Sequence, residues 1–422
     1  MTLEGFKVKK KENAIYHELL VIGGGASGLM AAIAAARAGT DTAVLEHTDK
    51  IGKKLLSTGN GHCNLTNMVQ QPDCYRGHDS GIAWQIIEKF PETATIDFFR
   101  SLGLVTKDRG GYIYPWSNQA VSVLRAIKTE LYRLHIPVCY RTKPLKLYKD
   151  AEKKHFYCVT ENGLYECSRL ILAAGSKAAP KTGSDGSGYA LAEQLGHTVS
   201  PVLPALVQLT AAEECFKRFS GIRAEGQITL YIDGAAAAEE EGELQLTAYG
   251  LSGIPVFQVS RFAAEGLYRG AEVTAEIDFC PCLSKTELAD LTDRRLGSGI
   301  RLGEILGGIL HERIAEEIAS MAKDKEESIR LTKHFPVTIT GTKDFEQCQA
   351  CMGGVPLFEI YPGTMESRVT EGLYLAGEIL DVDGSCGGYN LQWAWSSGHL
   401  AGVSAAESIM QECRKQAKED RI

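Results

Sequence analysis

Apolar runs that end in glycine and continue into longer apolar or amphipathic stretches recur along the chain. The first run, residues 19–22, breaks into residues 23–28, of which four are glycine, and continues into the alanine-rich residues 29–38. Such a pattern is typical of a buried strand, a tight turn and a helix. A second short apolar run, Thr42–Leu45, follows Gly39 and predicts another buried strand.

Further along the chain the pattern changes from helical to strand-like and back. Helices are predicted over residues 82–102 and 121–135, followed by a strand at 136–139 that would extend the parallel sheet. Short alternating runs then predict an antiparallel meander and a strand at 170–173, and strand signals continue over residues 201–278. The remaining predictions are turns at 233–234 and at the acidic run 239–243, helices over 284–296 and 303–321, and a strand at 373–376.

The first glycine turn has the spacing of a dinucleotide-binding fingerprint. Gly23 permits the tight turn, Gly25 lets the backbone approach a pyrophosphate, and Gly28 allows close packing of helix and strand. The free N–H groups and the positive dipole end of the helix would then face the anion. Glu46 follows Gly28 by 18 positions, where a carboxylate accepts hydrogen bonds from a ribose and disfavours a 2′-phosphate. This segment therefore predicts FAD or NAD rather than NADP, bound by Gly23, Gly25, Ala26, Ser27, Gly28 and Glu46.

Length and composition fit a globular protein of two or three domains. The chain has 422 residues, of which 44% are hydrophobic and 23% are charged. A formal net charge of −8 without a large basic run argues against nucleic acid or an anionic membrane as the main partner. Residues 1–16 contain four lysines but no apolar region, which predicts a frayed extension rather than a secretory signal. We therefore expect a cytoplasmic protein with a small-molecule substrate, while the pattern carries no signal for the oligomeric state.

Twelve cysteines without a secretory signal favour reduced thiols over disulfide bonds. Two pairs have the short spacing seen in metal sites, a C-x-x-C of Cys348 and Cys351 and a C-x-C of Cys280 and Cys282. Together they could hold zinc if the fold brought them close. Neither pair has the regular partner spacing of a zinc ribbon, so we expect buried structural thiols and no metal site.

The loop after Glu46 is rich in glycine, asparagine and hydroxyl residues. Residues 51–67 show neither a strand nor an amphipathic helix pattern, and their side chains suit a polar ligand. A nucleotide cofactor extends beyond its adenosine half at this place, and for FAD the extension is the ribityl chain and isoalloxazine. FAD is therefore the predicted cofactor, with contacts from Lys54, Gly59, Asn60, Gly61, Asn64 and Thr66.

Together with the fingerprint, residues 59–67 (Gly-Asn-Gly-His-Cys-Asn-Leu-Thr-Asn) resemble the bacterial NAD(P)/FAD-dependent oxidoreductases that include aminoacetone oxidases and 3-dehydro-bile-acid Δ4,6-reductases. The resemblance covers nearly the whole chain, through motifs at 170–175, 180–186, 250–253, 352–355, 372–378 and 387–392. It implies an α/β fold with a Rossmann-like FAD-binding domain that contains a parallel sheet and a β-meander, an inserted β-rich substrate domain and a small helical subdomain. The expected boundaries are 1–195 and 351–422 for the FAD domain, 196–282 and 334–350 for the substrate domain, and 283–333 for the helical subdomain.

The C-terminal motif supports the same cofactor. The strand at 373–376 is followed by a glycine turn at 387–392, which opens a helix through residue 406. In flavoproteins of this kind such a helix start lies at the pyrimidine side of the flavin, where negative charge accumulates on reduction. A simple helix cap is the alternative. The resemblance implies further FAD contacts from Val138, Ala174, Gly175, Gly377, Glu378, Gly388, Tyr389, Asn390 and Leu391.

The sequence departs from the family pattern at three places. Residue 62 is His where Arg is expected, residues 173–179 lack a Thr-Gly-Gly, and Ala248 stands where many members have His, which argues against a shared catalytic His. Reduction of a C=C conjugated to a ketone needs hydride from flavin N5 and a proton donor. Tyr249 is the first candidate donor and His62 the second, with plain packing or hydrogen bonding as the alternative for both.

Three functions remain open at this point. The first is a FAD-dependent reductase of an apolar enone, such as a 3-oxo steroid or bile-acid intermediate, with NAD(P)H as co-substrate. The second is a flavin oxidase that passes electrons from a small amine to oxygen and yields hydrogen peroxide. The third is a non-catalytic or RNA-associated flavin-binding protein, against which the acidic balance counts. Because no second G-x-G-x-x-G follows a strand and no C-x-x-x-x-C lies beside the flavin loop, a two-dinucleotide disulfide reductase is not expected.

Overall fold

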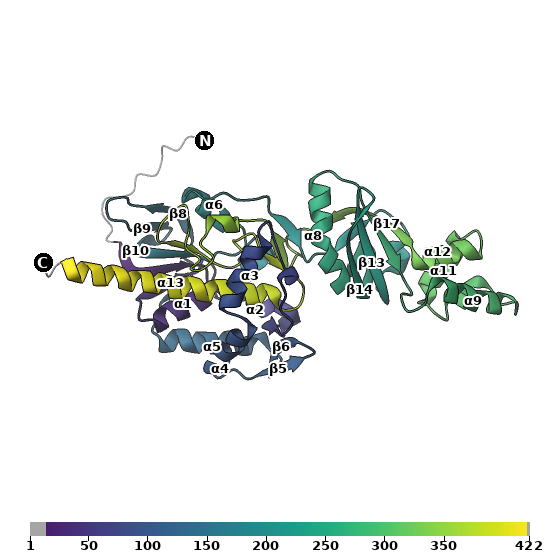
Figure 1. The fold of residues 1–422 in the computed structure, drawn as a ribbon, viewed down its shortest axis with the longest axis horizontal. Helices are drawn as coiled ribbons and strands as arrows, with labels where there is room; N and C mark the ends of the chain where they lie inside the picture. Colours follow the sequence, from purple (N-terminus) through teal and green to yellow (C-terminus); the bar gives the residue numbers. More distant parts are fainter. Residues whose placement is uncertain (1–13, 420–422) are drawn as a thin grey trace. The chain divides into compact units, whose positions relative to one another are not determined.

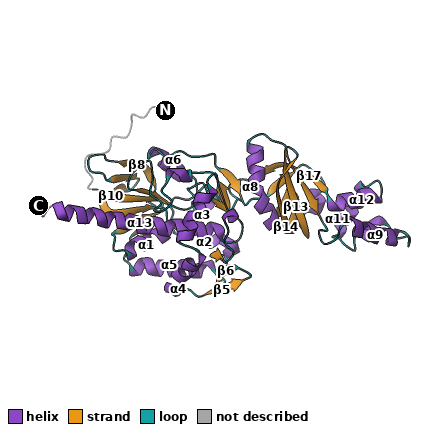
Figure 2. Cartoon of the chain, in the orientation of Figure 1, coloured by secondary structure: helices purple, strands orange, loops and turns teal. Residues whose placement is uncertain are grey.

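The computed structural model describes residues 14–419, and Figures 1 and 2 show their fold. The chain forms two compact units, one of Met1–Val202 with Met352–Ile422 and the other of Leu203–Cys351. Each unit has its own buried apolar core. The second unit is therefore an insertion between two parts of the first. The frayed extension predicted for residues 1–16 lies mostly outside the described residues.

A seven-stranded sheet of the first unit consists of β1 (Ile15–Ile22), β2 (Thr42–Leu45), β7 (Val138–Cys139), β8 (Pro144–Lys149), β9 (Phe156–Thr160), β10 (Gly163–Leu172) and β19 (Leu373–Leu375). The strand order is β7-β2-β1-β10-β9-β8, and β19 pairs with β10. β7, β2, β1, β10 and β19 are parallel, whereas β10, β9 and β8 pair antiparallel as a meander. The last strand of the predicted meander and the strand predicted at 170–173 are one strand, β10, because this whole segment runs beside β1. The parallel sheet with its helices confirms the predicted α/β class.

Helices pack against this sheet and against one another (Figure 2). They are α1 (Ala26–Arg37), α2 (Lys53–Ser57), α3 (Ser80–Lys89), α4 (Glu92–Ser101), α5 (Ala120–Arg133), α6 (Ser187–Gln194) and α13 (Tyr389–Glu419). The helix predicted over 82–102 is two helices, because Pro91 cannot continue the first and occupies the N-cap of the second. Short strands complete the unit: β3 (Thr66–Asn67) with β5 (Thr106–Arg109) and β6 (Tyr112–Pro115), and β4 (Tyr75–Arg76) with β20 (Asp383–Gly384).

Small residues let α1 and α13 cross with their backbones in contact. A Cβ on Gly398 would lie 2.3 Å from the backbone oxygen of Ser27, and a Cβ on Gly402 would lie 2.2 Å from that of Ala31. Both distances are far below van der Waals contact, so the crossing requires glycine at both positions of α13.

A carboxylate with two guanidinium partners joins α1 to α5. Glu130 is 6% exposed and accepts hydrogen bonds from Arg133 at 2.7 and 2.8 Å and from Arg37 at 2.7 Å. These bonds, first that of Arg133 and then that of Arg37, lower the pKa of Glu130 from 4.5 to about 2. Because the folded pKa is depressed, the stabilisation is complete above pH 4.5 and is lost as the pH falls through about 2.

We expect Glu130→Gln to lower the free energy of unfolding by about 2 kcal/mol at pH 7, since hydrogen bonds to charged groups contribute about 1.5–3 kcal/mol. Urea unfolding measured at several pH values should also show a weaker loss of stability between pH 4.5 and 2 in this variant than in the parent. Asp97→Asn is the control, because Asp97 and Arg100 form an exposed pair on α4 that contributes little. Equal pH profiles for the parent and Glu130→Gln would contradict this account.

The second unit is built on a closed barrel of β12 (Leu209–Ala211), β13 (Arg223–Ile232), β14 (Ala235–Thr247), β15 (Gly250–Gly253), β16 (Val273–Asp278) and β17 (Phe335–Thr342). The acidic turn predicted at 239–243 is wrong, because these residues lie within β14 and pair with β13. Glu239 accepts a hydrogen bond from Thr229, and Glu243 pairs with Arg223 across the two strands. Cross-strand pairing therefore outweighs the weak strand preference of glutamate.

The barrel carries a helix that the pattern did not predict, α8 (Ile254–Tyr268), within a region expected to contain only strands. The helix predicted over 303–321 ends at Leu306, where Gly307 and Gly308 follow, and resumes at Glu312. The other elements of this unit are α7 (Phe216–Phe219), α9 (Lys285–Leu296), α10 (Leu302–Leu306), α11 (Glu312–Met321) and α12 (Lys325–Lys333), with the strand pair β11 (Leu203–Ala205) and β18 (Ala350–Met352).

Residues 14–419 contain neither a cluster of metal-ligating side chains nor a helix suited to a bilayer. No group of three or more Cys, His, Asp or Glu side chains in this range is placed to hold a metal ion, the two cysteine pairs included. No helix in the same range combines the length and the apolar character that crossing a bilayer requires.

Candidate functional site

The carboxyl ends of four parallel strands lie at one edge of the first unit's sheet. β1 leads to Gly23, β2 to Glu46, β10 to Ala174 and β19 to Gly377. The strand order changes direction at β1, because the chain continues to β2 on one side while β10 lies on the other. Ligands of open parallel sheets bind in the crevice outside the strand ends at such a point. This edge is therefore the candidate site.

In the glycine turn after β1, backbone atoms lie close to two of the glycines, whereas the space beside a third is empty. Gly23 has φ +112°, and a Cβ there would lie 2.3 Å from the carbonyl oxygen of Ala173. A Cβ on Gly28 would lie 2.0 Å from the carbonyl oxygen of Gly23. Gly25 is the N-cap of α1, and a Cβ there would meet nothing within 4 Å. The N-terminus of α1 is therefore open to a ligand that approaches Gly25, and it begins with Ala26 and Ser27.

Glu46 is held beside this turn by two backbone hydrogen bonds. Its Oε2 accepts from the N–H of Gly24 at 2.9 Å, and its Oε1 accepts from the N–H of Thr48 at 2.7 Å. The residue is buried at the end of β2. An ionised carboxylate has about four acceptor positions, so two remain for other donors.

The loop 51–67 is more regular than predicted. α2 and a 3-10 turn, Thr58–Gly61, occupy its middle, and the buried side chain of Leu55 anchors α2. Gly59, Asn60, Gly61 and Cys63 then have φ values of 53°, 52°, 86° and 57°. Because Asn60 and Cys63 are not glycines, their left-handed conformations are strained, and such strain clusters at ligand-binding sites.

A charged network connects three of the loops at this edge. Lys54 of α2 forms an ion pair with Glu378, which follows β19, and Ser176 donates a hydrogen bond of 2.8 Å to the same carboxylate oxygen. Lys54 and Glu378 are among the predicted cofactor residues. Ser176 was missed, and its partner lies 202 positions away in sequence, so a single sequence has no signal for this contact.

The start of α13 packs on the loop after α2. Gly388 has φ +97°, and a Cβ there would lie 2.8 Å from the backbone oxygen of Thr66 and 3.0 Å from Oδ1 of Asn64. Trp393 donates a hydrogen bond of 3.0 Å to the carbonyl oxygen of Gly377. A second helix N-terminus is thereby fixed to the strand end that carries Gly377 and Glu378.

Asn64 has an unpartnered acceptor at this place. Its Oδ1 is buried and has no hydrogen-bond partner within the described part of the chain. A buried acceptor left unpaired costs about 1–3 kcal/mol, which a ligand with an N–H or O–H donor would recover. Asn390 differs, because its amide accepts from the N–H of Gly384 at 2.8 Å and donates to the oxygen of Gly384 at 2.9 Å. Asn390 therefore shapes the turn before α13.

The other predicted cofactor residues are also in the first unit. Val138 pairs with Val44 in the parallel sheet, Gly175 has φ +75° after β10, and Tyr389 donates a hydrogen bond of 2.9 Å to the carbonyl oxygen of Val69. Leu391 packs against the apolar core from α13.

The two predicted proton donors lie in different units. His62 of the first unit is exposed, and its Nδ1 lies 2.8 Å from the carbonyl oxygen of Asn118. Tyr249 of the second unit is half-buried in the turn between β14 and β15. The ammonium nitrogen of Lys343 lies 4.1 Å from the centre of its ring. Each candidate therefore has a neighbour in its own unit that orients it.

Cys63 lies next to His62 but is not poised for thiol chemistry. Its side chain is buried, and this burial raises its pKa to about 12. A thiol with such a pKa is protonated at neutral pH, and the thiolate is the nucleophile in disulfide exchange.

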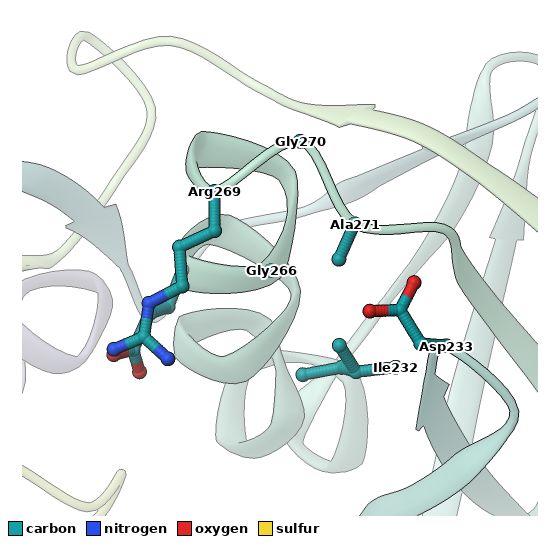
Figure 3. Close-up of a pocket in the computed structure, with 7 residues that line it drawn as sticks. Ile232, Asp233, Gly266, Arg269, Gly270 and Ala271 are labelled. Atoms are coloured by element: carbon teal, nitrogen blue, oxygen red, sulfur yellow. The ribbon is translucent and has the colours of Figure 1, made fainter.

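A pocket of about 300 Å³ in the second unit has none of the predicted site residues in its lining (Figure 3). Arg269 points along α8 and bonds to Glu265, whereas Asp233 lies on the other side of the pocket. Asp233 already accepts a hydrogen bond of 2.9 Å from the N–H of Glu272. The pocket lining consists of Ile232, Asp233, Glu265, Gly266, Arg269, Gly270 and Ala271.

Comparisons with known proteins agree with this architecture. The family described as HI0933-like protein Rossmann domain matches residues 17–404. The 3-dehydro-bile acid delta(4,6)-reductase of Clostridium scindens is 44% identical over 406 residues, which cover 92% of this chain and 98% of that protein. A ribosomal RNA dihydrouridine synthase of Haemophilus influenzae is 29% identical over 413 residues, which cover 92% and 98%. The solved 3-ketosteroid delta1-dehydrogenase of Sterolibacterium denitrificans has a similar fold, with a TM-score of 0.50, 12% identity and coverage of 93% of this chain and 100% of that chain.

Proposed function

The chain belongs to the HI0933-like Rossmann family, and we propose that it is a FAD-dependent oxidoreductase that reduces a C=C bond conjugated to a ketone. Its substrate is apolar and of steroid or bile-acid type, and NAD(P)H is the electron donor. The observation that carries the proposal is a set of three features at the edge of the first unit's sheet. The N-terminus of α1 is open at Gly25, the carboxylate of Glu46 is held by backbone hydrogen bonds, and Oδ1 of Asn64 has no partner among the described residues. The 44% identity to a bile-acid reductase along nearly its whole length supports the substrate class.

The residues at this edge fit FAD. When bound, FAD supplies hydride transfer at N5. The N-terminus of α1 would bind the pyrophosphate, because its backbone N–H groups and dipole favour an anion and Gly25 has no Cβ to obstruct it. Glu46 would accept hydrogen bonds from the ribose. Asn64 Oδ1 would accept from a donor group of FAD and so gain a partner that the described residues do not provide.

The start of α13 and the Lys54–Glu378 pair act on charge at the site. The N-terminal dipole of α13 favours negative charge, which reduction of the flavin produces. Glu378 holds Lys54 and accepts from Ser176, so the lysine stays in one position at the edge between α2 and β19.

Exposed apolar side chains beside the start of α13 support an apolar substrate. Met68, Val69 and Tyr112 are 39%, 55% and 40% exposed. The ring of Tyr112 is 2.8 Å from where a Cβ on Gly387 would lie, so this cluster adjoins the turn that opens α13. Apolar surface at this end of the site suits a sterol skeleton better than a small charged amine.

Tyr249 is proposed as the donor of the proton to the α-carbon. Tyr249→Phe should lower kcat by about 10²–10⁴-fold with little change in KM, because a positioned general acid contributes about that much. Steady-state kinetics with the solvent deuterium isotope effect measure it, and Tyr268→Phe, an exposed tyrosine of the same unit, is the control. Unchanged kcat in Tyr249→Phe together with a large loss in His62→Gln would assign the role to His62.

A second candidate function is the reduction of a uridine in ribosomal RNA. The C5=C6 bond of uridine is conjugated to a carbonyl, so the same hydride chemistry would give the dihydrouridine that the Haemophilus influenzae relative is named for. One observation favours it: residues 141–154, which include the edge strand β8, contain six Lys or Arg and two Asp or Glu. Tyr148 of this segment stacks on Tyr157 at 5.2 Å. Basic residues among aromatic ones are typical of nucleic-acid surfaces, whereas the net charge of −8 counts against it.

Anaerobic stopped-flow absorbance of the purified holoprotein tests these functions. NADH and NADPH are mixed separately with the protein, and the bleaching of the flavin band is followed. We expect fast bleaching by one of them and fast reoxidation by a steroid 4-en-3-one, with slow reoxidation by air. Reoxidation by ribosomal RNA transcripts but not by the enone would favour the second candidate. Bleaching by an amine alone, with fast recovery in air, would identify an oxidase and contradict the proposal.

A further inference from the structure

Two cysteines of the second unit bring their sulfur atoms close together. Cys280 and Cys282 lie in the loop between β16 and α9, and their Sγ atoms are 3.6 Å apart. Pro281 separates them, and the N–H of Leu283 donates to the carbonyl oxygen of Cys280 at 3.2 Å, which closes a tight turn. The turn therefore presents both sulfurs on one side.

The neighbours of the turn hold its backbone in place. Lys333 donates to the carbonyl oxygens of Cys280 and Leu283 at 2.9 and 2.7 Å, and its ammonium pairs with Asp278 at 2.5 Å. Asp278 in turn accepts from the N–H of Cys280 at 2.8 Å. The backbone of the pair is therefore held by charge-assisted hydrogen bonds.

The two thiols differ in access. Cys282 is exposed, whereas Cys280 is 3% exposed, and this burial raises the pKa of Cys280 to about 11. An exposed thiol can reach an external disulfide, and a buried one next to it can react only with its neighbour. The C-x-x-C of Cys348 and Cys351 lacks this asymmetry, because both residues are buried.

We propose that Cys280 and Cys282 form a reversible dithiol–disulfide site that reacts with small-molecule disulfides of the glutathione type. The Cys282 thiolate attacks the external disulfide, so that a bond to one of its sulfurs forms, the old S–S bond breaks, and a thiolate leaves and takes up a proton. Cys280 then gives its proton to water and attacks Cys282 Sγ, which forms the internal S–S bond and releases the second external thiol. The two cysteines lose two electrons, and the external disulfide gains them.

The geometry favours the second step. A disulfide requires an S–S distance of about 2.05 Å, so the sulfurs must approach by roughly 1.6 Å from their 3.6 Å separation. Because the loop encloses a single residue, the ring is small, and strained or exposed disulfides are the ones that are readily reduced again. The site is therefore expected to respond to the ratio of thiol to disulfide rather than to stay bridged.

The test uses the full-length holoprotein, reduced, freed of reductant and incubated with glutathione buffers of increasing oxidised fraction. After alkylation and trypsin digestion, the peptide of residues 270–285 contains Cys280 and Cys282 and no other cysteine. In oxidising buffers we expect both cysteines of this peptide to escape alkylation together. The unlabelled peptide should be lighter than the reduced, unalkylated peptide by two hydrogens, and both cysteines should be alkylated again after treatment with dithiothreitol. A peptide that keeps both labels under oxidising buffers, or that carries a stable glutathionyl group in the parent protein, would overturn the proposal.

Variants separate the two steps. Cys280→Ser should stop the reaction at a stable glutathionyl adduct on Cys282, and Cys282→Ser should leave Cys280 unmodified. Cys413→Ser is the matched control, because Cys413 is exposed but lies on α13 in the first unit. This variant should form the bridge as the parent does. Thermal unfolding of each variant checks that it folds. If Cys280→Ser does not fold, the result for the parent protein still decides the proposal.

Discussion

Replacing Gly25 with valine is expected to weaken FAD binding strongly without unfolding the protein. Gly25 has φ −85° and ψ −174°, an extended conformation that valine adopts readily, and a Cβ there would meet no protein atom within 4 Å. The valine side chain would instead occupy the space in front of α1, where the pyrophosphate is proposed to bind. Forcing extra methyl groups into a close contact costs about 1–3 kcal/mol, which corresponds to a loss of roughly 5- to 150-fold in affinity.

Flavin content after purification and a titration of the flavin-free variant with FAD measure this effect. Gly363→Val is the control, because Gly363 also has no atom within 4 Å of a Cβ and lies outside the proposed site. The control should bind FAD like the parent. An FAD affinity of flavin-free Gly25→Val equal to that of the parent would place the cofactor elsewhere, and a large fall in thermal stability of the flavin-free variant would show that Gly25 is structural.

The second large effect is expected at the crossing of α1 and α13. Gly402→Ala places a Cβ 2.2 Å from the backbone oxygen of Ala31, and a backbone atom cannot move aside as a flexible side chain can. Overpacking costs about 1–3 kcal/mol and sometimes more, while the better helix propensity of alanine returns up to about 1 kcal/mol. We expect a net loss of about 2 kcal/mol in the free energy of unfolding of the first unit.

Tryptophan fluorescence during urea unfolding reports on this unit, since Trp84, Trp116, Trp393 and Trp395 all belong to it. Gly81→Ala is the matched substitution, because Gly81 lies in α3 with no atom within 4 Å of a Cβ. This variant should be as stable as the parent or slightly more stable. If the two alanine variants unfold at the same urea concentration, the close approach of the helices is not the reason why position 402 requires glycine.

The sequence predicted those features that depend on residues near each other along the chain. The turn from Gly23 to Gly28 could be predicted because its conformation follows from glycine spacing, and the structure has the left-handed Gly23 and the close contact at Gly28 that the spacing requires. The missed helix α8 had a local signal as well. Pro255 lies in its first turn and Gly253 at its N-cap, a combination that favours a helix start over a strand.

Other features depended on distant contacts and could not be predicted in this way. Ser176 contacts Glu378 only because β10 and β19 are neighbours in the sheet. The acidic residues 239–243 form a strand only because β13 supplies partners for them. Whether Asn64 Oδ1 has a hydrogen-bond partner likewise depends on how the loops pack and on the nearby Gly388. The motif at residues 59–67, which contains Asn64, does not determine it.

The insertion of one unit into the other has a consequence for synthesis on the ribosome. Leu203–Cys351 is a continuous segment, so this unit can fold once it has emerged, whereas the first unit still lacks β19 and α13 at that moment. The 71 residues from 352 to 422 take roughly 4–14 s to translate at about 5–20 residues per second. During this interval the apolar face of α1 that later contacts α13 has no partner from α13. The nascent chain is therefore most exposed to aggregation late in translation, when a chaperone that binds apolar helices would protect it most.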